Sequence, residues 1–219
     1  MASVAKFTDH SVCNHLRHIA RTIAHPSNQD IDPERSELNY SLIPDRGMTA
    51  FEYYKERKGQ LYCFNRADVK TLAGWIVTAP AELPAEELDP FFKEVYNFLS
   101  QRYGEVNTID AIVHKDESGR PHLHFYFIPV VPDQKHGGEK ICANEVLSKA
   151  EYYRFHTDLQ EHLTGCGFNV NVNSGITREQ GGNITVKEYK EQRVLEREPQ
   201  ADRWAGVHEK EYEVERGRW

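Results

Sequence analysis

The chain has 219 residues, of which 39% are hydrophobic and 28% are charged, and its formal net charge is −7. This length supports one sizeable hydrophobic core rather than two separate domains. The acidic balance argues against a protein that binds nucleic acid through charge alone, although a bound divalent cation would add local positive charge. Because the sequence contains no long apolar run and no basic leader, we expect neither a membrane span nor a signal peptide, and we expect a cytoplasmic location.

Charge distribution and cysteine spacing further restrict the class of protein and the kinds of metal site that we expect. The acidic excess is concentrated in residues 71–110, which carry two Lys or Arg against seven Asp or Glu. We expect it on the solvent face of one helix. The four cysteines, Cys13, Cys63, Cys142 and Cys166, are far apart and form no CxxC pair. Reduced thiols are therefore expected, and a cysteine metal site is not.

A helix is predicted over residues 12–24. Ser11 is the expected N-cap, and the residues at 25–28 should end the helix because they include a proline. His18 and Arg21 lie three residues apart, so we expect their side chains to share one helix face. The apolar residues at helical spacing are Val12, Leu16, Ile19, Ala20 and Ile23.

Strands and helices follow one another along the rest of the chain. We predict a strand at 38–42, a helix at 49–58, a strand at 71–78, a helix at 89–103, a hairpin at 109–129, a loop at 131–138, a helix at 148–164 and a strand at 168–172. Residues 1–10 show little pattern, residues 173–183 read as a loop, and a charged helix is expected at 186–195. The predicted fold class is α+β, with a central antiparallel sheet, helices packed on one face and the histidines of the hairpin on the other.

The hairpin carries the strongest chemical signal. His122 and His124 are two residues apart on a predicted strand, so their side chains share one face, and His114 ends the partner strand. Three neutral imidazoles that converge from rigid strands make a three-nitrogen site for a divalent cation, with open coordination positions. Asp116 and Glu117 are available to hold the imidazoles in one tautomer or to act on a nucleophile. The alternative is a histidine-rich surface loop without a ligand.

These motifs resemble those of the HUH endonucleases, and among them the Mob/Pre plasmid mobilization and recombination relaxases. The hairpin is similar to the HxDExxPHxH motif of that family, with one additional residue between Glu117 and His122. The upstream blocks that look like the opening of these relaxases are His18-Ile19-Ala20-Arg21, residues 27–36 and Leu38-Asn39-Tyr40. The resemblance covers roughly residues 14–190. The combination of the two motifs in this order is specific, whereas either motif alone would only be suggestive.

The resemblance implies a relaxase that nicks one DNA strand at an origin of transfer. It implies one divalent cation, Mn²⁺ or Mg²⁺, which is bound by the three imidazoles and acts as a Lewis acid on the scissile phosphate. His18 matches the nucleophile of this branch, which leaves a 3′-OH and a covalent adduct with the 5′ phosphate. Arg21 is then expected to stabilise charge on the phosphate, and Glu117 to accept the proton on the other nitrogen of His18. Asp116 is expected to orient the metal-binding histidines through hydrogen bonds without binding the ion itself.

DNA is the expected partner, as an origin-of-transfer hairpin with an adjacent single strand, together with conjugation or coupling proteins. The expected phosphate contacts are Arg17, Arg35, Arg46, Lys135 and Arg178. Binding through phosphates should weaken steeply with salt. We expect a relaxase domain over residues 1–195 and a charged tail at 196–219. The long C-terminal region typical of the family is missing from this sequence, which indicates a truncated relaxase domain or a minimal member.

Three alternatives remain open at this point. One is an HUH nickase of the replication-initiator or transposase type with a tyrosine nucleophile, for which Tyr40 is the first candidate, and His18 is then one solvated histidine on a helix. The second is a small-molecule metallohydrolase that uses the same three-histidine site, and the third is a DNA-binding module without activity. The other tyrosines considered are Tyr53, Tyr54, Tyr152 and Tyr153. The histidines interpreted as incidental are His136, His156, His162 and His208.

Overall fold

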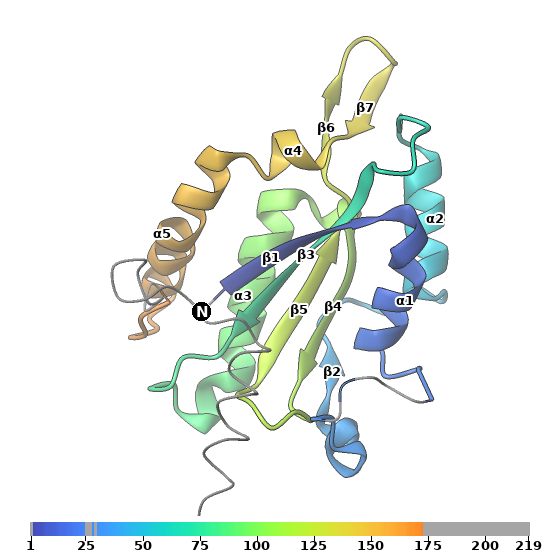
Figure 1. The fold of residues 1–219 in the computed structure, drawn as a ribbon. Coiled ribbons are helices and arrows are strands. Elements are labelled where there is room, and N and C mark those ends of the chain that lie inside the picture. Colours follow the sequence, from blue (N-terminus) through green and yellow to red (C-terminus); the bar gives the residue numbers. More distant parts are fainter. Residues whose placement is uncertain (1, 25–27, 29, 173–219) are drawn as a thin grey trace, which may run out of the picture. The chain divides into compact units, whose positions relative to one another are not determined.

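A five-stranded antiparallel sheet forms the centre of the computed structural model, which describes residues 2–24, 28 and 30–172 (Figure 1). Its strands are β1 (Ala2–Thr8), β2 (Tyr40–Ser41), β3 (Lys70–Thr78), β4 (Thr108–His114) and β5 (His122–Phe127). They lie in the order β1-β3-β5-β4-β2. The predicted central antiparallel sheet is therefore confirmed, and the second strand of the predicted hairpin, β5, is its middle strand.

One face of the sheet is covered by two long helices, α3 (Leu88–Tyr103) and α5 (Lys149–Gly165), as predicted (Figure 1). The odd-numbered side chains of β5 belong to the larger hydrophobic cluster, which includes the buried residues of both helices. Within it, Trp75 and Phe155 stack with their ring centroids 3.5 Å apart and join β3 to α5. Burial of such large aromatic rings is the main favourable contribution to the packing of this layer.

The opposite face carries α1 (Asp9–Ile19) and α2 (Ala50–Gly59) over part of the sheet (Figure 1). Their buried side chains form a second hydrophobic cluster with residues of β3, β4 and β5, Tyr126 among them. The N-terminus of α2 is fixed by a capping box between Thr49 and Glu52. Because His122 and His124 have the same strand parity as Tyr126, the histidines lie on the α1 side, away from α3 and α5.

The N-terminal segment differs from the prediction in two places. Residues 2–8 form β1, an edge strand paired with β3, although their sequence shows little pattern. The helix α1 begins directly after Thr8, so Ser11 is not the N-cap, and its hydroxyl instead donates to the carbonyl of Thr8 at 2.9 Å. The helix ends at Ile19 rather than at residue 24, because Arg21 adopts a left-handed φ of 53° that a helix does not tolerate.

Short elements complete the described part of the chain. They are the 3-10 helices η1 (Pro33–Leu38), η2 (Ala85–Glu87) and η3 (Glu105–Asn107), the helix α4 (Ala143–Val146), and the strands β6 (Val130–Asp133) and β7 (Gly138–Ile141). The last two form an antiparallel hairpin, so the predicted loop at 131–138 is confirmed only for the turn at 134–137, and its two ends are strands. The turn is made possible by Gly137 and Gly138, whose φ values are 91° and 140°.

Residues 168–172 are not the strand that was predicted. The side chain of Gln160 satisfies their backbone instead, since its Nε2 donates to the Val170 carbonyl at 2.7 Å and its Oε1 accepts from the Val172 N–H at 2.8 Å. The predicted loop at 173–183, the helix at 186–195 and the boundary at residue 195 lie outside the described residues. Within the described ranges, no helix combines the length and the apolar character that crossing a membrane requires.

Gly74 provides a test of the sheet beneath the histidines. A Cβ atom at this position would lie 2.6 Å from Cε1 of the buried Tyr126 ring. We expect Gly74→Ala to lower the free energy of unfolding by about 1–3 kcal/mol, because the packed ring has to move. Gly59→Ala is the matched control, since no atom outside the adjacent residues and the backbone of its own helix lies within 4 Å of the added Cβ. Urea unfolding of both variants measures the difference, and equal midpoints would contradict this view of the packing.

Candidate metal and nucleophile site

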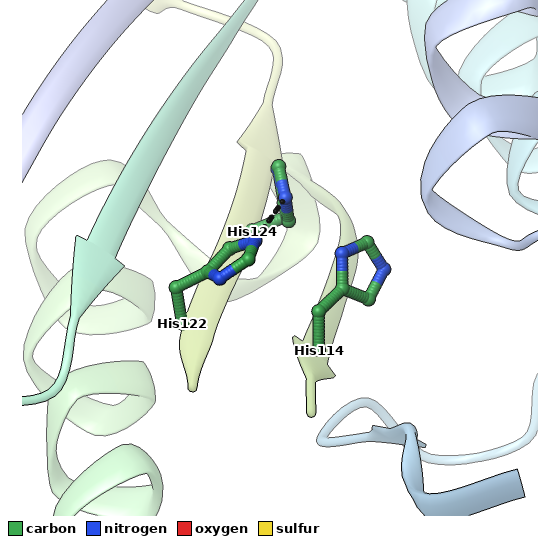
Figure 2. Close-up of side chains that lie close together, drawn as sticks. All are labelled: His114, His122 and His124. Atoms are coloured by element: carbon green, nitrogen blue, oxygen red, sulfur yellow. Dashed lines mark hydrogen bonds between the residues drawn. The ribbon is translucent and has the colours of Figure 1, made fainter. Parts of the chain in front are cut away.

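Three imidazoles meet on the α1 side of the sheet (Figure 2). His114 and His122 are direct cross-strand partners, and His124 follows on the same face of β5. The ring centroids lie 4.6 to 5.4 Å apart, and Nε2 of His122 is 3.1 Å from Nε2 of His124. One ligand nitrogen from each ring lies within 4.8 Å of those of the other two. The structure thus brings together the three residues that the sequence analysis assigned to a cation.

The surroundings of His114 and His124 favour the neutral form of these two rings. Burial and the nearby charge of Arg21 lower the pKa of His114 to about 4, and burial lowers the pKa of His124 well below its ordinary value. Nε2 of His114 donates to the carbonyl of Ile19 at 2.7 Å, which places the ring proton on that side. Nδ1 of His114 therefore carries the lone pair, which Arg21 Nη2 meets at 3.1 Å, and a neutral imidazole is the form that binds metal ions.

A single guanidinium, that of Arg21, connects the end of α1 to the loop after β4. It donates to both carboxylate oxygens of Asp116 at 2.7 and 2.8 Å and to Glu117 at 2.9 Å. It also donates to the carbonyl of His18 at 3.3 Å and lies 3.1 Å from Nδ1 of His114. The expectation that Arg21 shares a helix face with His18 is wrong, because its left-handed backbone lies beyond the helix and directs the side chain at this loop.

Asp116 is the most enclosed carboxylate of the site, with a fully buried side chain. Burial alone would raise its pKa, but hydrogen bonds from Arg21 and from Ser36, whose Oγ lies at 2.9 Å, hold the pKa well below its ordinary value. The neighbouring Lys115 N–H donates to Oδ1 of Asn39 at 2.7 Å. Ser36 and Asn39 were not predicted as site residues, although both belong to the N-terminal blocks on which the resemblance rests.

A second set of ligand atoms shares one of the histidines. His114, Asp116 and Glu117 also lie close enough together to hold an ion. Both carboxylates, however, already form ion pairs with Arg21 at 2.7 and 2.9 Å. A cation between them would have to displace a guanidinium from a buried pair, which is costly. The three imidazoles are therefore the favourable metal set.

His18 lies in the last turn of α1 and is half-buried. Burial and the charge of Arg21 lower its pKa, against the opposite effect of the Glu117 and Asp116 carboxylates. A neutral imidazole of this kind is a competent nucleophile. The expected hydrogen bond between His18 and Glu117 is not formed: within residues 2–24, 28 and 30–172 the His18 ring has no hydrogen-bond partner, and Glu117 binds Arg21 instead.

Tyr40, the alternative nucleophile, lies on the other side of the sheet. It pairs with Val113 across β2 and β4 and packs against the cluster on the α3 side. Its hydroxyl donates to Oδ1 of Asp89 at 2.6 Å, and burial together with this bond raises the pKa of the phenol. The structure therefore does not bring Tyr40 to the three imidazoles.

The predicted DNA contacts divide into two groups. Arg17 on α1 and Arg35 on η1 are exposed and belong to elements that border the site. Arg46 donates to the Thr108 and Ile109 carbonyls at the start of β4, and Lys135 lies in the β6–β7 turn. Both positions are at the end of the sheet away from His114 (Figure 1). Arg178 is outside the described residues.

Removal of Arg21 tests the buried ion pairs of the site. We expect Arg21→Ala to lower the free energy of unfolding by about 3–5 kcal/mol, because it leaves the buried carboxylate of Asp116 uncompensated. Arg66→Ala is the matched control, since the Arg66–Asp68 pair is 69% and 75% exposed and should contribute nothing measurable. Denaturant unfolding at neutral pH measures both variants.

The pH dependence gives the same prediction a second readout. Because the folded-state pKa of Asp116 is depressed, its stabilising contribution is complete above the unfolded-state pKa of about 4 and is lost as the pH falls below it. Asp116→Asn should therefore remove part of the acid destabilisation of the wild type. Equal stability of Arg21→Ala and Arg66→Ala, or an unchanged acid profile in Asp116→Asn, would refute the role given to this pair.

Comparisons with known proteins agree with the geometry. The sequence matches the profile of the Mob_Pre family, described as plasmid recombination enzyme, over residues 1–191. The plasmid recombination enzyme of Lactiplantibacillus plantarum is 30% identical over 184 residues, which cover 80% of this chain and 48% of the relative. That of Bacillus sp is 32% identical over 187 residues, which cover 78% of this chain and 41% of the relative. The chain thus spans about half, or less, of the length of these relatives.

Solved structures give the same assignment. The Mn-bound crystal structure of the MobM relaxase domain (MOBV; Mob_Pre) with plasmid pMV158 oriT DNA matches with a TM-score of 0.71 and 28% identity, covering 88% of this chain and 97% of that one. A second Mn-bound crystal structure of that domain, with a 23-nucleotide oriT DNA, matches with a TM-score of 0.70 and 25% identity, covering 89% and 97%. Profile, sequence and fold agree, and the chain belongs to the Mob_Pre family of plasmid recombination enzymes.

Proposed function

We propose that this chain is the catalytic domain of a metal-dependent DNA relaxase, which nicks one strand at an origin of transfer and remains covalently bound to the 5′ phosphate. The observation that carries the proposal is the convergence of three imidazoles, of which His124 lies close enough to His18, in the last turn of α1, for the two rings to interact electrostatically. Support comes from relatives named plasmid recombination enzymes and from the MobM relaxase domain, crystallised with oriT DNA. The reaction would serve the mobilization of a plasmid or mobile element.

The donor set fits a single divalent cation held by His114, His122 and His124. The MobM relaxase domain is Mn-bound in its crystals, which favours Mn²⁺ over Mg²⁺ in our proposal. When bound, the ion supplies Lewis-acid polarisation of the scissile phosphate. The protein's contribution is to present the ring nitrogens from two paired strands, with His114 and His124 held in the neutral form and the Ile19 carbonyl fixing the tautomer of His114.

His18 is proposed as the nucleophile. A ring nitrogen of His18 forms a bond to phosphorus, and the bond from phosphorus to the 3′ oxygen breaks, which gives a 3′-OH strand and a phosphoramidate to the 5′ strand. The proton on the other ring nitrogen is released as the adduct forms, and the leaving 3′ oxygen takes up a proton. Because the adduct keeps the energy of the phosphodiester, the reverse attack by a 3′-OH rejoins the strand without another source of energy.

Arg21 and the two carboxylates are proposed as positioning residues in this reaction. Arg21 binds Asp116 and Glu117 and also the His18 carbonyl, so its guanidinium fixes the end of α1 against the metal ligands. This assignment replaces the expectation that Glu117 accepts a proton from His18. A correctly held nucleophile contributes to catalysis through orientation, which does not require that Arg21 touch the phosphate.

DNA is the proposed partner, and its phosphates are expected along the surface that borders the site. Arg17 and Arg35 are the proposed contacts, since Arg17 is exposed on α1 and Arg35 is exposed on η1. Arg46 is not included, because its guanidinium already binds two carbonyls and stacks on the Tyr53 ring at 3.8 Å. Lys135 is placed too far along the sheet to contact the same phosphates. Arg178 remains a predicted contact.

Metal dependence is the first test of this proposal. We expect His122→Ala or His124→Ala to abolish Mn²⁺-dependent nicking of a supercoiled plasmid that carries an origin of transfer, because either change removes a ligand. His136→Ala, in the β6–β7 turn, is the matched control and should leave nicking unchanged. Agarose electrophoresis after SDS and protease treatment measures nicking, and unimpaired nicking by the wild type in excess EDTA would rule out the metal role.

The identity of the nucleophile is a separate prediction. His18→Ala should lose the covalent protein–DNA adduct and retain binding of metal and DNA, whereas Tyr40→Phe should still form it. A phosphorus–nitrogen bond is labile in acid and more stable in base, and a phosphotyrosine ester survives acid. The adduct, trapped on a labelled oligonucleotide and treated with mild acid, should therefore fall apart. An adduct that resists acid, or one that Tyr40→Phe removes, would assign the chemistry to tyrosine.

A further inference from the structure

A second group of ligand atoms lies on the face of the sheet opposite the three imidazoles. Glu94 of α3 meets His162, in the last turn of α5, and Cys166, the residue that caps this helix. Oε2 of Glu94 is 3.5 Å from Nε2 of His162 and 3.5 Å from Sγ of Cys166, and Sγ is 3.8 Å from Nε2. Three donors of different chemistry thus form a nearly equilateral triangle.

These separations are close to those around one tetrahedral zinc ion. With Zn–S of about 2.3 Å and Zn–N or Zn–O of about 2.0–2.1 Å, tetrahedral angles separate S from N or O by about 3.6 Å and N from O by about 3.3 Å. The triangle of Glu94, His162 and Cys166 differs from these values by only a few tenths of an ångström. A mixed set of thiolate, imidazole and carboxylate suits Zn²⁺ and excludes Mg²⁺ or Ca²⁺, which take oxygen ligands.

Local structure holds the three side chains in this arrangement. His162 and Cys166 are four residues apart at the end of α5, which places them on one side of the helix. The Cys166 N–H donates to the carbonyls of His162 and Leu163, so the thiol is anchored by the helix terminus. Asn97 donates to Oε1 of Glu94 at 3.3 Å and leaves Oε2 for the other two ligands.

We propose that Glu94, His162 and Cys166 form a zinc-binding site that joins the C-terminal end of α5 to α3. Glu94 and Cys166 line an open cavity of about 600 Å³ together with Tyr40 and Phe168, so the fourth coordination position is accessible to water. Cysteine spacing along the sequence did not indicate such a site, because the proposed zinc ligands include only one cysteine. One of the other two ligands, Glu94, belongs to a different helix. The site is independent of the proposed nicking chemistry, since it lies across the sheet from His114, His122 and His124.

Cobalt is the optical probe for this site, because only a thiolate ligand gives a charge-transfer band with Co²⁺ in the near ultraviolet. The full chain is titrated with Co²⁺, and we expect a band whose final intensity corresponds to one thiolate-bound ion and which is lost on addition of Zn²⁺. Cys166→Ser should abolish the band, and Glu94→Gln or His162→Gln should weaken binding by at least about tenfold. Cys63→Ser is the matched control and should keep the band. So should His122→Ala, which separates this site from the three-imidazole site.

Alkylation gives a second, independent measurement. Zn²⁺ should slow the reaction of Cys166 with iodoacetamide at least about tenfold and leave the rate at Cys63 unchanged, as read by mass spectrometry of the labelled peptides. His162→Gln should restore the fast rate at Cys166, since glutamine is close in size to histidine and the partly buried side chain lies at the edge of the core, beside Phe98. No band with Co²⁺, a band that survives Cys166→Ser, or a Cys166 rate that Zn²⁺ does not change would each overturn the proposal.

Discussion

The buried carboxylate of Asp116 is the constraint on which the rest of the site depends. A carboxylate removed from water is stable as an anion only when it is paired and hydrogen-bonded, and Arg21 provides the cation. Because Arg21 follows α1 almost directly and has a left-handed backbone, satisfying Asp116 also fixes where the helix ends. The same guanidinium and the Ile19 carbonyl contact His114, so the proposed nucleophile and the proposed metal ligands are positioned by one connected set of hydrogen bonds.

Periodic patterns in the sequence predicted most of the fold and most of the candidate metal site. Period two along β5 placed His122 and His124 on one face, the hairpin turn brought His114 beside them, and helical spacing located α3 and α5. The elements that were missed depend on partners distant in sequence: β1 is held by β3, and residues 168–172 are held by the side chain of Gln160. The direction of the Arg21 side chain depends on one positive φ angle, and the spacing of residues along the sequence does not predict such an angle.

Net charge describes the average of the whole surface and not the face on which we propose that DNA binds. The chain is acidic as a whole, yet the acid-rich region around α3 lies across the sheet from the imidazoles, and Arg17 and Arg35 are exposed on the site's own side. A DNA strand meets one face rather than the average of all faces. Glu94, on the opposite face, is one of the proposed zinc ligands. We therefore propose a different metal site on each side of the same sheet.

A crystal structure of the chain with Mn²⁺ and a single-stranded oligonucleotide spanning its nick site tests the central claim most directly. The account predicts an anomalous manganese peak bound by nitrogens of His114, His122 and His124, with the His18 ring as the protein group nearest to the scissile phosphorus and Arg21 still bound to Asp116. A manganese peak away from these three imidazoles, or a tyrosine hydroxyl in place of His18 at the phosphorus, would contradict it.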